Sequence, residues 1–81
     1  MKHATETALV QLSALLDELR RRSMRERKPG IFYVKSQSFL HFHEDTEGLF
    51  ADLRAGDDFD RYPVNTEAEQ AKFLAAVDRA L

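Results

Sequence analysis

Two histidines, His41 and His43, stand two residues apart in the stretch from Phe39 to Asp45, which is rich in large apolar side chains. Side chains alternate between the two faces of a β-strand, so both imidazoles project from one face if this stretch is a strand. Neutral imidazole is a common protein ligand for transition metals. The spacing therefore predicts the beginning of a transition-metal site.

Such a site needs a third ligand and often a fourth, each at about 2.0–2.2 Å from the ion. Asp52, Glu44 and Asp45 are the carboxylates that could complete it, and we assign the metal set to His41, His43 and Asp52. Two alternatives stay open. The histidines could simply hydrogen-bond carboxylates on a half-exposed strand, or they could form a pH-sensitive interface, because imidazole titrates near neutrality.

His41 could also act as a general base oriented by Asp52 across a hairpin, but catalysis needs a pocket and a reacting group as well. The sequence contains no G-x-S-x-G turn, no phosphate-binding loop and no glycine-rich dinucleotide loop. We therefore assign no catalytic and no cofactor-binding residue. A divalent transition metal is the one cofactor that the residues suggest, and a binding protein is favoured over an enzyme.

A basic segment is the second feature that could bind a ligand. Six of the twelve basic residues lie within nine positions, and they are Arg20, Arg21, Arg22, Arg25, Arg27 and Lys28. Such a group could contact phosphates. However, successive arginines point in different directions around a helix, no aromatic residue is interleaved to stack bases, and the net charge is −2. The alternative is a solvated helix end that complements the helix dipole, so nucleic acid is not the partner that we expect.

Composition indicates an ordinary folded protein. The 81 residues are 43% hydrophobic and 32% charged, which predicts one domain over residues 1–81 rather than disorder. There is no cysteine, so disulfides and thiolate ligands are excluded. No apolar stretch approaches the ~18 residues of a membrane span, and charges interrupt every apolar stretch near the start. A cytoplasmic location is the default expectation.

Two acidic groups, at 44–47 and 57–60, lack the spacing of a calcium-binding loop. They are typical of solvent-exposed turns.

Helical patterns occur at both ends of the chain. Apolar residues from Ala8 to Leu19 recur at helical spacing, which predicts a helix over residues about 5–25 that Thr5 or Thr7 caps. Pro29-Gly30 ends it. Thr66 and Glu69 have the spacing of a capping box at the start of a second helix.

The middle of the chain is typical of β-structure. Four short stretches rich in aromatic and branched residues, 31–35, 39–43, 49–54 and 59–64, are separated by gaps that suit hairpin loops. Gaps this short predict an antiparallel meander, and Pro63 places the last strand at an edge. The expected fold is a two-layer α+β domain in the order α-β-β-β-β-α. Both helices would cover one face of a four-stranded sheet.

Alternation along the strands predicts what each face carries. If Leu40, Phe42, Leu49, Ala51 and Leu53 point to the helices, the opposite face carries Phe39, His41, His43, Phe50 and Asp52. The first strand is undecided. A two-residue turn at Ser36-Gln37 would direct Ile31 and Tyr33 inward, and a three-residue turn would direct Phe32 and Val34 inward instead.

The outer face would expose several large apolar side chains, which is typical of a partner surface or a dimer interface. We therefore expect a small binding or interaction module, homodimeric through Phe39, His41, His43 and Phe50. The alternatives are a metal-binding protein or enzyme that uses His41, His43 and a carboxylate, and a nucleic-acid-binding protein that uses residues 20–28.

The stretches KPGIFY at 28–33, SFLHFH at 38–43 and LFADL at 49–53 resemble a small bacterial family of uncharacterised proteins. They are similar to the short luciferase-associated domain, whose strands carry an H-x-H element followed by an A-D-L/I step, and the strand order is loosely similar to YjbR-like α+β proteins. The resemblance covers residues 28–54, and typical family members are longer. It implies the α+β fold and emphasises His41, His43 and Asp52, but it implies no reaction.

Overall fold

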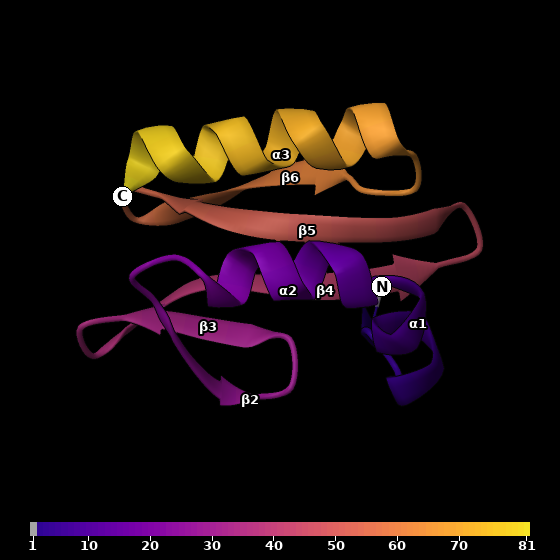
Figure 1. Ribbon diagram of the computed structural model, residues 1–81, viewed down its shortest axis with the longest axis horizontal. Coiled ribbons are helices and arrows are strands. Elements are labelled where there is room, and N and C mark those ends of the chain that lie inside the picture. Colours follow the sequence, from indigo (N-terminus) through magenta and orange to yellow (C-terminus); the bar gives the residue numbers. More distant parts are fainter. Residues whose placement is uncertain (1) are drawn as a thin grey trace.

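An antiparallel sheet forms the body of the protein in a computed structural model that describes residues 2–81 (Figure 1). The elements in chain order are β1 (Lys2–His3), α1 (Glu6–Gln11), α2 (Ser13–Arg20), β2 (Arg25–Lys28), β3 (Ile31–Val34), β4 (Gln37–Asp45), β5 (Gly48–Ala55), β6 (Asp58–Pro63) and α3 (Glu67–Ala80). The α+β class and the antiparallel sheet predicted from sequence are confirmed. None of the helices in residues 2–81 is long and apolar enough to cross a membrane.

The strands follow one another across the sheet in the order β2-β3-β4-β5-β6, so the predicted meander is confirmed. The predicted count of four strands is wrong, because β2 adds a fifth and the short β1 also pairs with β4. The sequence of β2 is Arg-Glu-Arg-Lys, which has no apolar alternation to indicate a strand. The hairpin turn at Pro29-Gly30 directs it against β3, with Gly30 at a φ of +77°.

The predicted single helix over 5–25 is wrong in two respects. It is divided at Leu12, whose backbone leaves the helical region at φ −96° and ψ 13°, and its second part ends at Arg20. Arg22 donates through Nη1 to the Glu18 carbonyl at 2.6 Å and so helps to close that end. At the start, the Thr5 side chain accepts the Ala8 amide at 3.3 Å, which confirms the cap.

Helix α3 begins as its sequence pattern predicts. The Thr66 hydroxyl accepts the Glu69 amide at 3.1 Å, and the Glu69 carboxylate accepts the Thr66 amide at 3.2 Å. These reciprocal bonds satisfy two amides that the first helical turn leaves unpaired. The helix therefore has a fixed origin, from which it buries Phe73, Ala76 and Val77.

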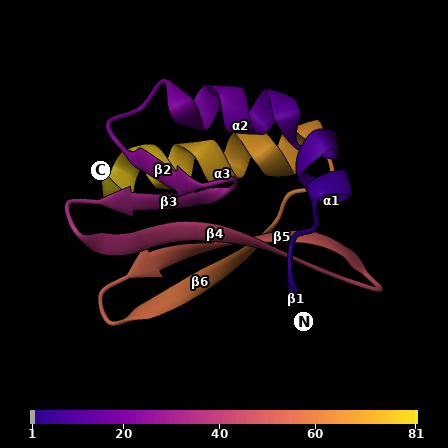
Figure 2. The same ribbon diagram turned by 90° about the horizontal axis from the view of Figure 1, so that it is seen from below.

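Helices α2 and α3 lie on the same side of the sheet (Figure 2), and α3 runs along β6 (Figure 1). The core fills the space between these two layers. Its buried apolar residues are Leu12, Leu15, Leu16 and Leu19 from the N-terminal helices, Phe32, Phe39, Leu40, Phe42, Ala51 and Leu53 from the strands, and Val64, Phe73, Ala76 and Val77. Burial of these side chains is the main force that holds the layers together.

The register of β3 resolves the orientation that the sequence leaves open. Phe32 is fully buried and Val34 packs against the core, so these two side chains point inward. The connection is a two-residue turn at Lys35-Ser36, and Lys35 has a φ of 59°. The pairing then shifts, because Phe32 lies opposite Leu40 while Tyr33 lies opposite Ser38.

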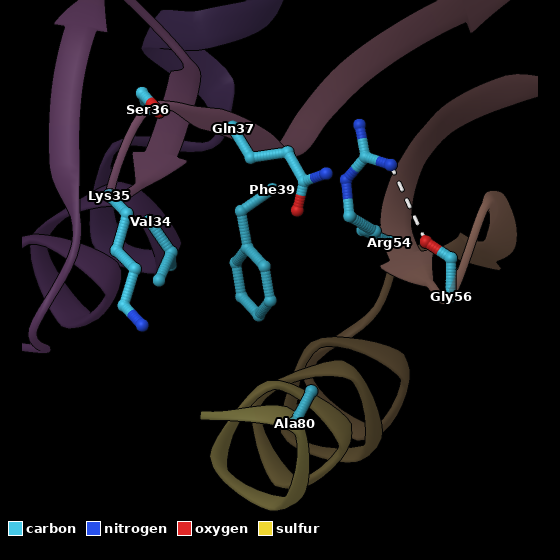
Figure 3. Close-up of a pocket in the computed structure, with 8 residues that line it drawn as sticks. All are labelled: Val34, Lys35, Ser36, Gln37, Phe39, Arg54, Gly56 and Ala80. Atoms are coloured by element: carbon cyan, nitrogen blue, oxygen red, sulfur yellow. Dashed lines mark hydrogen bonds between the residues drawn. The ribbon is translucent and has the colours of Figure 1, made fainter.

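This shift is a β-bulge, and it overturns the predicted orientation of Phe39. Phe39 was expected on the outer face beside His41, but it is only 8% exposed and belongs to the core. Figure 3 shows its ring pointing from β4 toward α3, where Ala80 lies. An extra residue on one strand breaks strict alternation, so Phe39 and Leu40 both face inward.

Candidate metal centre

The pairing of β4 with β5 assembles the centre of the candidate site. His41 lies directly opposite Asp52, and His43 lies opposite Phe50, and strand alternation places all four on the face opposite to the buried one. Their neighbours Leu40, Phe42, Ala51 and Leu53 form the buried face of the same two strands. Cross-strand alternation therefore separates the ionisable residues from the core while keeping them in the middle of the sheet.

One Asp52 oxygen lies between the two imidazoles. Asp52 Oδ2 is 3.1 Å from His43 Nε2 and 3.5 Å from His41 Nε2. One ligand atom from each of the three residues lies within 4.8 Å of the others. Two ligands on one tetrahedral zinc ion are separated by about 3.3 Å, given bonds of about 2.0–2.1 Å. The two separations from Asp52 Oδ2 to the imidazole nitrogens are close to this value.

The Asp52 carboxylate is buried, with 6% of its surface exposed, and Arg61 from β6 holds both of its oxygens. Arg61 donates from Nε to Oδ1 at 2.8 Å and from Nη2 to Oδ2 at 2.9 Å. Burial on its own would raise the pKa of Asp52, but the Arg61 hydrogen bonds and charge, with the two histidines, lower it below its ordinary value. Asp52 is therefore an anion at neutral pH.

The environment of His41 favours a neutral ring. Burial lowers the pKa of His41, and repulsion from His43 lowers it further, against the opposing effect of the Asp52 charge. A neutral imidazole has a nitrogen lone pair, which is what a metal ligand must offer. The electrostatics of the cluster thus keep the carboxylate charged and the His41 ring uncharged.

His3 is a neighbour that the sequence reasoning missed. Strand β1 places it opposite His43, and its ring centroid lies 4.9 Å from that of His43 and 5.6 Å from that of His41. No periodicity marks a two-residue strand, so the pairing was not predictable from the local sequence. The sequence did offer one signal, because His3 is the only histidine besides His41 and His43.

Phe59 was also missed, and it borders the cluster on the β6 side. Its ring centroid lies 4.9 Å from that of His41 in an edge-on arrangement, and the Arg54 guanidinium lies 4.7 Å from the Phe59 centroid. The ring shields one side of His41 from solvent, in keeping with the burial that lowers the His41 pKa. Arg54 in turn covers the ring, so this phenylalanine presents less free apolar surface to a partner.

The first three arginines of the basic segment 20–28 are engaged in ion pairs. Arg20 contacts Asp17 and Glu26, Arg21 contacts Glu18, and Arg22 contacts Asp78 and Glu18. Arg25, Arg27 and Lys28 lie on the exposed strand β2, where Arg27 lies 5.0 Å from the centroid of Tyr33. Nucleic-acid binding through this segment stays a prediction.

A pocket of about 720 Å³ lies apart from the histidines (Figure 3). Its lining residues are Val34, Lys35, Ser36, Gln37, Phe39, Arg54, Gly56 and Ala80, which include no carboxylate and no imidazole. Arg54 is bonded there to the carbonyls of Ser38 and Gly56. Of the acidic groups predicted in turns, Glu47 and Asp57 lie in the β4–β5 and β5–β6 turns, whereas the other acidic residues lie at the ends of the flanking strands.

Comparisons with protein-family models, curated proteins and solved structures found no match. The resemblance to the luciferase-associated family therefore stays a prediction. The fold and the site define the protein as a small α+β protein with a histidine–carboxylate cluster on the face of its sheet opposite the helices.

Proposed function

We propose that this protein binds a divalent transition-metal ion through His41, His43 and Asp52. The observation that carries the proposal is the convergence of two imidazoles on one buried carboxylate oxygen, at 3.1 and 3.5 Å. The shorter contact has the length of an imidazole–carboxylate hydrogen bond. A bound ion would bring all three groups together, because the ligands of one ion must approach one another closely.

The ligand types select the class of metal. Imidazole nitrogens suit zinc, nickel, copper and iron, whereas calcium and magnesium prefer oxygen ligands alone. An ion on Asp52 Oδ2 would use the oxygen lone pair that faces the histidines and leave the Arg61 bonds in place. Arg61 would then orient the carboxylate, as groups bonded to metal ligands commonly do. Its positive charge opposes that of the ion, so we expect the affinity to be moderate.

The experiment is a titration of chelator-treated protein with Zn²⁺ in competition with a chromophoric chelator. We expect one ion per chain. Loss of a ligand in His43→Ala or Asp52→Asn should weaken binding by at least about tenfold, since even groups that only support ligands contribute 10–100-fold. Co²⁺ gives a second readout, because its visible absorption reports the number and type of its ligands.

The matched control is Asp57→Asn, which removes an exposed acid at the β5–β6 turn and leaves the cluster intact. Its affinity should equal that of the unaltered protein. The proposal is wrong if the folded, unaltered protein takes up no Zn²⁺, or if Asp57→Asn weakens binding as much as Asp52→Asn does.

A second candidate function is the homodimeric interaction module, and the lack of a helix over the outer face among residues 2–81 favours it (Figure 2). Phe50 lies partly exposed on this face, but the inward turn of Phe39 removes one apolar side chain that the prediction relied on. Sedimentation equilibrium tests it. Self-association that Phe50→Ser abolishes would support the module, and a monomer at high concentration would contradict it.

A further inference from the structure

We infer that His3 is a further ligand of the same ion, so that metal binding fastens strand β1 to β4. This inference rests on the proposed function, since it names a ligand for that site and a segment that the site would control. It turns the set of His41, His43 and Asp52 into a site of three histidines and one carboxylate. Such a set suits zinc or another metal that accepts nitrogen ligands.

The backbone determines where His3 lies. In the antiparallel ladder His3 is the partner of His43, and the Ala4 amide donates to the Phe42 carbonyl at 3.1 Å. Residues directly opposite each other in such a ladder have their side chains on the same face. His3 is therefore on the side of the sheet that carries His41, away from Phe42 and the core.

The separations of the three rings are close to those that one ion requires, although the group of ligand atoms within 4.8 Å of one another belongs, among residues 2–81, to His41, His43 and Asp52 alone. Imidazoles bound at about 2.1 Å have centroids about 3.2 Å from the ion, which places two such centroids about 4.5–5.2 Å apart at angles of 90–109°. The observed separations are 4.7 Å for His41 and His43, 4.9 Å for His3 and His43, and 5.6 Å for His3 and His41. Two of the three lie within this range, and the third exceeds it by a few tenths of an ångström.

The His3 ring is also the exposed member of the group. The half-buried His41 and His43 and the buried Asp52 form the base of the site, and His3 approaches it from the chain terminus. Side-chain rotation therefore adjusts the position of His3 more freely than that of the others. This arrangement suits a ligand that joins last.

Metal binding by His3 would also stabilise the backbone of β1 and the start of helix α1. Directly after His3, the Thr5 amide donates to Glu44 Oε1 at 2.6 Å, and Thr5 caps helix α1. A ladder of two residues holds β1, and short terminal strands open easily. A bond from His3 to the ion would couple the start of α1 to the middle of the sheet.

The test compares His3→Ala with the unaltered protein in two measurements. In the Zn²⁺ competition titration, His3→Ala should bind at least about tenfold more weakly, yet more tightly than His43→Ala. In amide hydrogen exchange followed by NMR, Zn²⁺ should slow exchange at Ala4 in the unaltered protein but not in His3→Ala. Thr7→Ala, an exposed change on α1, is the control and should behave as the unaltered protein.

The outcomes separate the two proposals. If the unaltered protein takes up no Zn²⁺, the metal site and this inference fail together. If it takes up Zn²⁺ and His3→Ala has the same affinity and the same protection at Ala4, His3 is not a ligand and only this inference is overturned.

Discussion

The two faces of the sheet are made from the same strands and yet differ in almost every physical property. Along β4 and β5, the face toward the helices carries Leu40, Phe42, Ala51 and Leu53, which are buried among apolar side chains. The opposite face carries His41, His43 and Asp52, which contact one another and Arg61. The difference shows how a strand period of two lets 81 residues support both a core and a polar cluster.

The polar cluster also depends on the apolar face. Asp52 stands between Ala51 and Leu53 in a central strand, so the packing that buries those two also holds the carboxylate rigidly. Rigid elements position ligands more accurately than loops do. The inner face therefore contributes stability directly, and it contributes to the site by keeping the cross-strand pairs in register.

Paired truncations of phenylalanine on the two faces should produce the largest contrast. Phe32→Ala empties a fully buried position on the inner face, and we expect a loss of about 3–5 kcal/mol in the free energy of unfolding. Phe59→Ala removes a partly exposed ring on the outer face and should cost about 1 kcal/mol. Urea denaturation measures both. Equal losses would show that the two faces contribute alike to stability.

Zinc should stabilise the protein through the outer face alone. At a free concentration of 100 times Kd, binding to the folded state adds about 2.7 kcal/mol, which raises Tm by about 10–20 °C for a domain of this size. A tenfold weaker site would gain only about 1.4 kcal/mol, so the increase should fall to about half or less in Asp52→Asn, whose inner face is unchanged. Thermal denaturation with and without Zn²⁺ is the measurement. An equal increase in Asp52→Asn would place the bound ion elsewhere.

The ion pair of Arg61 with Asp52 should contribute more to stability than the pair of Arg21 with Glu18 on the helix surface. Arg61→Ala leaves the buried Asp52 carboxylate without the two donors that bond its oxygens, and we expect a measurable loss in the free energy of unfolding. Arg21→Ala removes an exposed pair with Glu18 and should cost no more than about 1 kcal/mol. If Arg61→Ala and Arg21→Ala lose the same free energy of unfolding, burial of Asp52 does not strengthen its ion pair with Arg61.

The smallest expected effect is a pH dependence at the edge of the helix-covered face. The hydrogen bond from Arg20 lowers the pKa of Glu26, helped by the Gly30 amide and opposed by burial. A carboxylate with a lowered folded pKa stabilises the protein above its unfolded pKa, and this contribution disappears as the pH falls through the folded value. The stability difference between the unaltered protein and Glu26→Gln should therefore shrink on acidification from neutral pH to about pH 3. A difference that grows on acidification would contradict this assignment.

Much of the fold was predictable because its signals are local. The Thr66 capping box, the hairpin gaps and the edge position of Pro63 follow from short-range geometry, and each is present in the structure. Strand β2 was not predictable, because its four polar residues carry no alternation. The helix break at Leu12 was also unpredicted, since the apolar periodicity continues through it.

For the candidate site, the sequence by itself determined that His41 and His43 share a face, since residues two apart on a strand always do. It also suggested Asp52, because a short hairpin brings consecutive strands together. Only the tertiary structure decided that Arg61 holds this carboxylate, that a bulge turns Phe39 into the core, and that His3 lies beside His43. The physical reason is distance along the chain. Strand parity acts between neighbouring residues, whereas the pairing of β1 with β4 joins residues forty positions apart and depends on how the layers pack.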